Sequence, residues 1–396
     1  MSSSEFPEWI EDDLQKLRKA GLFRSRRTFK PLPDGRCLLE GQELVNLSSN
    51  DYLNLAHDPR LISLATTALQ EMGVGSRASA LVSGRTEWHA RLEQRLADFE
   101  GTDAAILFPS GYAANLGVVS AIAREGDTIY CDRLNHASLV DGSRLAGAKF
   151  RVYRHDHLGK LKRELDKTTG DGKTIIVTDS IFSMDGIRAP LGELCNLAEQ
   201  YQACLVIDEA HATGVWGATG RGLAEELNVE SRVTIRVGTL SKGLGTMGGF
   251  VAGSNSLIEW LWNRVRTQIY STALPPAICA AACESLNIIT AEPERRQQLH
   301  AQSEFLRQEL VNRSLLADNT SSGPIIPVIL KDPERTMSIA ADLQAAGFLV
   351  GAIRPPTVPQ GTSRLRISVT SAHQRADLDR FLKALDCSLA RFAKSR

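Results

Sequence analysis

Six short apolar runs, separated mostly by helix-length segments, constrain the fold of this chain more than any other feature. The runs occupy residues 104–108, 127–131, 150–153, 174–178, 203–207 and 234–238. Strands that alternate with helices in this way build a mostly parallel, doubly wound sheet. A further run at 249–252 follows too soon for a crossover helix, so we expect that strand to be antiparallel. The sequence therefore predicts an α/β fold with a mostly parallel, seven-stranded sheet.

The segments before and after this sheet indicate a division into three parts. Apolar spacing predicts an amphipathic helix within residues 1–20, two short strands over 36–48, and helices over 59–72, 86–100 and 275–316. The pattern after residue 320 is typical of a small α+β domain. We expect an N-terminal helix and strands in 1–48, a large domain in 49–290 and a small C-terminal domain in 291–396.

The composition excludes several classes of protein. The chain has 396 residues, of which 43% are hydrophobic and 23% are charged, as in ordinary globular proteins. Lys and Arg number 46, as do Asp and Glu, so no net positive charge attracts nucleic acid or an anionic membrane. No apolar window is long enough for a membrane span, and the acidic N-terminus lacks a signal-peptide pattern. The seven cysteines form no CxxC pair, which favours a reduced, cytoplasmic protein.

Polar, titratable or glycine-flanked residues follow five of the expected strands. These segments occupy residues 109–112, 132–136, 179–186, 208–211 and 239–243. In open parallel sheets, ligands bind outside the carboxyl ends of the strands. Each segment alone has a plain structural explanation, such as helix capping by Ser110 or a cap on the following turn by Asp208. Their recurrence at one edge of the sheet predicts a ligand site there.

Two histidines and one helix start stand out within these segments. His136 and His211 each follow a strand end that carries other polar groups. The helix that begins after Ser110 offers free N–H groups and a positive dipole end, which suit a phosphate. His155 and His157 form an HxH pair without a third ligand nearby, so we expect no metal site.

Lys242 is the strongest candidate for covalent chemistry. It follows an expected strand and is surrounded by glycines at 243, 245, 248 and 249, which let a backbone approach a ligand closely. A lysine held there can be desolvated and form a Schiff base, although an isolated lysine is more often a solvated surface residue. The same glycines match GxGxxG, but a strand follows them instead of a helix, so we interpret that match as chance.

Four sequence blocks resemble the α-oxoamine synthases, a family of fold-type I pyridoxal 5′-phosphate (PLP) enzymes. Thr239-Leu-Ser-Lys242-Gly-Leu-Gly is similar to the family's PLP-lysine motif. The blocks 135–139, 182–186 and 208–214 match the others in the family order, and the resemblance covers about residues 20–392. It implies a PLP-dependent transferase fold of type I and a homodimer with active sites at the subunit interface.

The resemblance also implies roles for individual residues. Lys242 would hold PLP covalently and then move the α-proton, Asp208 would pair with the pyridine nitrogen, and His136 would stack on the ring. The residues implied in the remaining cofactor contacts are Ser183 and His211 at the phenolic oxygen, Gly111, Tyr112 and Thr239 at the phosphate, and Thr272 from the other subunit. Those implied at the substrate are Arg354 at the amino-acid carboxylate, with Arg24, Asn50, His136 and Thr357 lining the site.

The stretch 352–366 is similar to family members that condense L-alanine with a pimeloyl thioester, carried by CoA or by an acyl carrier protein. Three alternatives stay open: a sibling enzyme that uses glycine or serine, a PLP aminotransferase, and a non-catalytic scaffold. A non-catalytic scaffold would not require Lys242, Asp208 and His136 together, so their joint presence argues against that alternative. The chain departs from the family at Arg77 and Ala80, which often are glycines, and at Asp179, where some members have a longer Glu.

Overall fold

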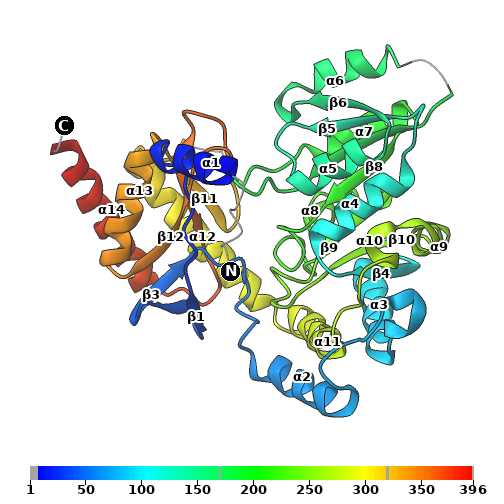
Figure 1. Ribbon diagram of the computed structural model, residues 1–396, viewed down its shortest axis with the longest axis horizontal. Helices are drawn as coiled ribbons and strands as arrows, with labels where there is room; N and C mark the ends of the chain where they lie inside the picture. The colour runs from blue at the N-terminus through cyan, green and yellow to red at the C-terminus, as the bar shows by residue number, and fades with distance from the viewer. Residues whose placement is uncertain (1–7, 169–170, 318–320, 395–396) are drawn as a thin grey trace.

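The computed structural model describes residues 8–168, 171–317 and 321–394, which form two lobes (Figure 1). The large lobe contains a seven-stranded sheet in the order β4-β10-β9-β8-β7-β5-β6. Its strands are β4 Ala104–Phe108, β5 Thr128–Asp132, β6 Lys149–Tyr153, β7 Thr174–Asp179, β8 Cys204–Asp208, β9 Ile235–Thr239 and β10 Gly249–Gly253. The predicted seven-stranded sheet is therefore confirmed.

The pairing of β10 sets it apart from the other strands of this sheet. It runs antiparallel to both β4 and β9, whereas the pairs β6–β5, β5–β7, β7–β8 and β8–β9 are parallel. The glycine-rich segment after Lys242 leads directly into β10 and not into a helix. The structure thus confirms the antiparallel strand and the interpretation of the GxGxxG match as chance.

Helices cover both faces of the large sheet. They are α2 Pro59–Met72, α3 Glu87–Glu100, α4 Gly111–Ile122, α5 Ala137–Leu145, α6 Leu158–Leu165, α7 Leu191–Gln200, α8 Leu223–Glu226, α9 Asn255–Arg264, α10 Arg266–Ile269 and α11 Pro276–Ala291. Neighbouring residues of β8 face opposite cores: Leu205 and Ile207 belong to one apolar cluster and Val206 to the other. Both faces are buried, which explains why these strands read as continuous apolar runs.

The small lobe is built from both ends of the chain (Figure 1). Its sheet has the order β1-β2-β3-β12-β13-β11, and β3 pairs in parallel with β12. The strands are β1 Phe29–Leu32, β2 Arg36–Leu39, β3 Gln42–Leu47, β11 Ile325–Lys331, β12 Phe348–Ile353 and β13 Ser363–Ser368. Its helices are α1 Glu8–Lys19, α13 Pro333–Ala345 and α14 Arg375–Lys394, and α12 Pro293–Asn312 connects the lobes.

Arg77 occupies a backbone conformation that glycine adopts more readily. Its φ is 65°, in the left-handed region, and its guanidinium donates to the carbonyl of Met72 at 3.1 Å. The neighbouring Ser76 hydroxyl donates to the carbonyl of Leu274. The loop therefore takes the left-handed turn with a side chain at this position, which glycine would adopt with less strain.

Within the described residues, no helix combines the length and apolarity that crossing a membrane requires.

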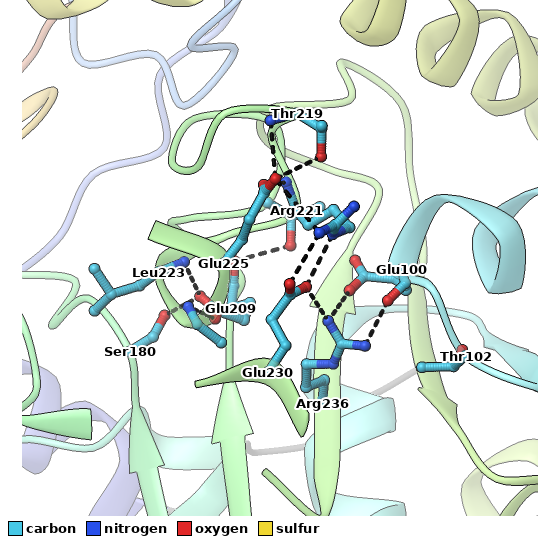
Figure 2. A network of polar contacts seen from close by, with 12 residues as sticks. Glu100, Thr102, Ser180, Glu209, Thr219, Arg221, Leu223, Glu225, Glu230 and Arg236 are labelled. Carbon is cyan, nitrogen blue, oxygen red and sulfur yellow. Dashed lines mark hydrogen bonds and ion pairs between the residues drawn. The ribbon is translucent and has the colours of Figure 1, made fainter. Parts of the chain in front are cut away.

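A buried ion network ties the loop after β8 to the amino end of β9 and to α3 (Figure 2). Arg236 contacts the carboxylates of Glu100 and Glu230 at 3.0 and 2.9 Å, and its side chain also donates to the carbonyl of Glu100. Arg221 donates twice to Glu230, at 2.9 Å each. Burial raises the pKa of Glu100 to about 8, although Arg236 opposes this shift.

Removal of Arg236 should destabilise the protein strongly, because the buried side chain of Glu100 loses its ion-pair partner, whereas Glu230 keeps Arg221. We expect Arg236→Ala to lower the free energy of unfolding by about 3–5 kcal/mol, measured by urea denaturation. The control is Arg232→Ala, which removes a partly exposed arginine that pairs with the exposed Glu199 at 2.6 Å. That variant should unfold close to wild type. Equal losses in the two variants would contradict the assignment of Arg236 as the anchor.

Candidate active site

A cavity of about 200 Å³ opens at the carboxyl edge of the large sheet, and residues from all five predicted strand-end segments line it. The parallel strands β5, β7, β8 and β9 end at this edge. The lining residues are Gly111, Tyr112, Asn115, His136, Asp179, Ile181, Asp208, Ala210, His211, Thr239, Ser241 and Lys242. A cavity therefore lies at the edge of the sheet where the sequence predicted a ligand site, and most of the predicted cofactor residues line it.

Asp208 ends β8 as a buried carboxylate with two donors. Its Oδ2 accepts from Asn115 Nδ2 at 2.6 Å, and its Oδ1 accepts from the backbone N–H of Ala210 at 2.8 Å. Asn115 comes from α4 and also donates to Ser138 at 3.0 Å. Both carboxyl oxygens of Asp208 therefore have a hydrogen-bond donor. Sequence reasoning missed Asn115; its only signal was an amide within an apolar helix.

Lys242 lies against a buried, neutral histidine. Its Nζ is 2.8 Å from His211 Nε2, and His211 Nδ1 is 2.7 Å from the hydroxyl of Tyr52. Burial holds the pKa of His211 well below its ordinary value, and the neighbouring charge of Lys242 adds to this effect. Burial also lowers the pKa of Lys242 to about 8, although the carboxylates of Asp208 and Asp179 oppose the shift. An amine with this pKa can gain or lose a proton near neutral pH.

Arg366 continues this chain of contacts into the small lobe. Asn50 Oδ1 accepts three hydrogen bonds, each at 3.3 Å. One comes from the hydroxyl of Tyr52 and two come from the terminal nitrogens of Arg366. Arg366 Nε donates to the carbonyl of Ser183 at 2.7 Å, so Asn50 and Ser183 are brought toward His211. The role of Arg366 was missed by sequence reasoning. The available signal was a charged residue at alternate positions of an otherwise apolar strand, β13, whose residues are all buried.

A second corner of the cavity combines a helix start with a close backbone contact. Ser110 caps α4 by accepting from the N–H of Ala113 at 3.1 Å. A Cβ added to Gly111 would come within 3.3 Å of Thr239 Oγ1, and one added to Gly249 would lie 2.6 Å from the carbonyl oxygen of Ser110. The first turn of α4 is therefore free to face an anion, as helix N-termini do.

His136 begins α5 at the same edge. Its Nδ1 contacts Ser138 Oγ at 2.7 Å, and its backbone N–H donates to Asp179 Oδ2 at 3.1 Å. The ring meets that of Tyr112 edge-on, with centroids 6.3 Å apart and planes at 80°. The Tyr112 hydroxyl donates to Asp141 at 2.6 Å. His136 thus lies at the cavity wall, and the buried carboxyl group of Asp179 holds its backbone N–H at the start of α5.

Three of the predicted substrate residues form a separate group outside this cavity. Arg24 donates to the hydroxyl of Thr357 at 3.0 Å, and Arg354 donates to the carbonyl of Phe23 at 2.8 Å. The structure therefore joins the N-terminal segment to the loop after β12. Thr272 also lies outside the cavity: it is exposed and bridges to Ser79. Among the described residues, those that line the cavity with Lys242 do not include Thr272.

Comparison with known proteins identifies relatives along nearly the whole chain. Residues 42–385 match the family model of aminotransferase class I and II. The chain is 44% identical over 375 residues to 8-amino-7-oxononanoate synthase 2 of Bacillus subtilis, covering 95% of this chain and 96% of that protein. It is 46% identical over 378 residues to the 8-amino-7-oxononanoate synthase of Anaeromyxobacter dehalogenans, covering 96% and 94%.

Solved structures share the same fold. A serine palmitoyltransferase variant from S. paucimobilis, with a bound PLP–myriocin aldimine, has a TM-score of 0.90 and 30% identity and covers 97% of both chains. The 8-amino-7-oxononanoate synthase of Francisella tularensis has a TM-score of 0.76 and 27% identity, and covers 88% of this chain and 99% of that one. The fold is thus that of the PLP-dependent transferases of type I, as the sequence predicted. Together with the site at the carboxyl edge, these findings show that the chain belongs to the class I and II aminotransferase family and, within it, to the 8-amino-7-oxononanoate synthases.

Proposed function

We propose that this protein condenses L-alanine with a pimeloyl thioester to give 8-amino-7-oxononanoate, carbon dioxide and a free thiol, in the biosynthesis of biotin. The observation that carries this proposal is the amine of Lys242, 2.8 Å from neutral His211 in a cavity that also contains the carboxylate of Asp208. The cofactor is PLP, as in the PLP-dependent fold and family to which the chain belongs.

The cavity is suited to a polar cofactor. Asn115 Oδ1 and Asp179 Oδ1 are buried and have no hydrogen-bond partner within the described residues, and both side chains line the cavity. Lys242 would hold PLP covalently, and Asp208 would pair with the ring nitrogen. The remaining contacts would come from His136 at the ring face, Ser183 and His211 at the phenolic oxygen, and Gly111, Tyr112 and Thr239 at the phosphate. When bound, PLP would withdraw electrons from the α-carbon of an amino acid that is joined to it through the amino nitrogen.

The chain's own residues supply proton transfer and orientation. Lys242 would take the α-proton of alanine and later return one, because its pKa of about 8 allows both states near neutrality. A carbon–carbon bond forms between the alanine α-carbon and the thioester carbonyl carbon, and the carbon–sulfur bond breaks to release the thiol. The alanine carboxylate leaves as carbon dioxide, and the electron pair left on the α-carbon takes up a proton.

Substrate binding would draw on both lobes. Arg354 would hold the alanine carboxylate, with Arg24 and Thr357 beside it and Asn50 on the side of the Lys242 cavity. Arg366 is a further candidate for the carboxylate, because its guanidinium is buried and contacts Asn50. A planar guanidinium can bind a carboxylate through two parallel hydrogen bonds.

We also infer a homodimer with active sites at the interface, in the cytoplasm. Thr272 is exposed and does not line the cavity of its own chain, which supports a role for Thr272 in the active site of a second subunit. The seven cysteines are free thiols, which suits a reducing compartment. Either CoA or an acyl carrier protein would deliver the pimeloyl group.

A second candidate function keeps the chemistry and replaces L-alanine by serine or glycine. It is favoured by one observation: the solved serine palmitoyltransferase superposes on a larger share of this chain than the solved 8-amino-7-oxononanoate synthase does. The higher identity of the 8-amino-7-oxononanoate synthases in sequence supports L-alanine.

Product analysis separates the two candidates. We expect the PLP-loaded protein to form 8-amino-7-oxononanoate from L-alanine and pimeloyl-CoA or the pimeloyl carrier-protein thioester, as identified by mass spectrometry. Lys242→Ala should lower this turnover by orders of magnitude, because the residue that moves the proton is gone, while the fold survives. A product from serine or glycine, and none from L-alanine, would favour the second candidate.

The lowered pKa of Lys242 predicts how the apoprotein takes up PLP. Only the neutral amine attacks an aldehyde, so the rate should rise about tenfold per pH unit and level off near pH 8. An ordinary lysine would level off near its pKa of 10.5. Stopped-flow absorbance of PLP uptake measures this profile, and borohydride reduction locates the label. A plateau only above pH 10, or a label on another peptide, would contradict the prediction.

Arg354→Lys should weaken L-alanine binding by about a hundredfold, because a lysine cannot reproduce the two parallel hydrogen bonds to a carboxylate. The visible spectrum of bound PLP should stay as in the wild type. Spectral titration with L-alanine, glycine and L-serine gives the affinities. Arg375→Lys is the control, since Arg375 is exposed and pairs with Asp379 on α14. Unchanged alanine affinity in Arg354→Lys would show that the carboxylate binds elsewhere. Arg366 would then be the next residue to substitute.

A further inference from the structure

Asp179 is a buried carboxyl group of the cavity for which the proposed reaction has no task. It ends β7, is 3% exposed and lines the cavity beside Lys242. The parallel register pairs it with Asp208 at the end of β8. Neighbouring strands lie about 4.8 Å apart, and both side chains face the same cavity, so the two carboxyl groups are close neighbours.

The two carboxyl groups differ in their donors. Asp208 accepts from Asn115 Nδ2 and from the N–H of Ala210. Asp179 Oδ2 accepts from the backbone N–H of His136 at 3.1 Å, and Asp179 Oδ1 has no hydrogen-bond partner in the described parts of the chain. A carboxylate oxygen that has no hydrogen-bond donor is costly to bury, whereas a protonated carboxyl oxygen can itself donate a hydrogen bond.

Two carboxylates that share a buried site do not both ionise, because each raises the proton affinity of the other. The member with more hydrogen-bond donors keeps the charge, and here that is Asp208, with two donors against one. Asp132 on β5 also disfavours a charge on Asp179, whereas Lys242 and the N–H of His136 favour it. Burial and then Asp208 dominate, and they hold the pKa of Asp179 well above its ordinary value.

We propose that Asp179 holds a proton beside ionised Asp208 and, as a neutral acid, positions His136 and offers one hydrogen bond into the cavity. Of this pair of carboxyl groups, only Asp208 would then carry a negative charge toward a bound cofactor. Asp179 acts through the backbone of His136, so it is a positioning residue. The proposal rests on the proposed function only for the identity of the ligand, PLP.

An amide tests this protonation state, because Asn reproduces a neutral acid: its oxygen accepts and its NH₂ donates. We compare Asp179→Asn, Asp179→Ala and Asp208→Asn as PLP-loaded proteins. Asp179→Asn should bind PLP within about threefold of wild type and keep the pH midpoint of its visible absorbance. Asp179→Ala should weaken PLP binding by about tenfold or more, since it loses both hydrogen bonds. Asp208→Asn should lower the midpoint by about one unit or more, because a negative charge that favours the protonated cofactor is gone.

The same midpoint measurement can overturn the proposal. If Asp179 is ionised, Asp179→Asn will also lower the midpoint by about one unit or more. If Asp179→Ala bound PLP as tightly as the wild type, that result would contradict the positioning role of Asp179. Infrared difference spectra of wild type against Asp179→Asn should contain a protonated carboxyl band at neutral pH, and its absence would contradict the proposal even if Asp179→Ala fails to fold. Wild-type protein that takes up no PLP would instead overturn the proposed function, so the two failures are distinguishable.

Discussion

The parallel hydrogen-bonded register of β5, β7, β8 and β9 is the constraint on which the site depends. Because parallel strands are joined by crossovers, all their carboxyl ends lie at one edge of the sheet. The register places Asp179 opposite Asp208, and the next strand end delivers Thr239 and Lys242 to the same cavity. A slip of one residue in β8 would turn Asp208 away from the cavity, because successive side chains of a strand face opposite sides.

Burial controls the chemistry of the groups collected there. Desolvation lowers the pKa of Lys242 to about 8 and keeps His211 neutral, because both would carry a positive charge when protonated. The same desolvation acts in the opposite direction on Asp179, which would carry a negative charge when ionised. Asp208, at the same edge, accepts two hydrogen bonds. The cavity therefore combines a hydrogen-bonded carboxyl group, one neutral imidazole and one amine whose pKa lies near neutrality.

The lobe built from both chain ends brings a second set of arginines toward this edge. Arg366 on β13 reaches the carbonyl of Ser183, which follows β7 in the large lobe. Arg354 on the loop after β12 and Arg24 in the N-terminal segment form a separate group, in which each arginine donates to the other segment. The two groups hold their arginines differently: Arg366 is buried and extensively hydrogen-bonded, whereas Arg354 is half-buried. A substrate carboxylate would thus meet a fixed arginine at the cavity and a more accessible one on the loop.

The amino-acid sequence alone determined the seven strands of the large sheet, the antiparallel β10 among them and the edge at which the ligand site lies, but it did not predict β1. These features depend on local apolar periodicity and on residues that directly follow each strand. Family motifs added roles for Lys242, Asp208 and His136, which remain proposals here. Tertiary structure alone decided that Asn115 supports Asp208, that Tyr52 contacts His211, that Arg366 reaches Asn50, and that Arg354 stands outside the Lys242 cavity. These contacts join residues far apart in the chain, and their geometry depends on how helices, strands and lobes pack, which no local spacing encodes.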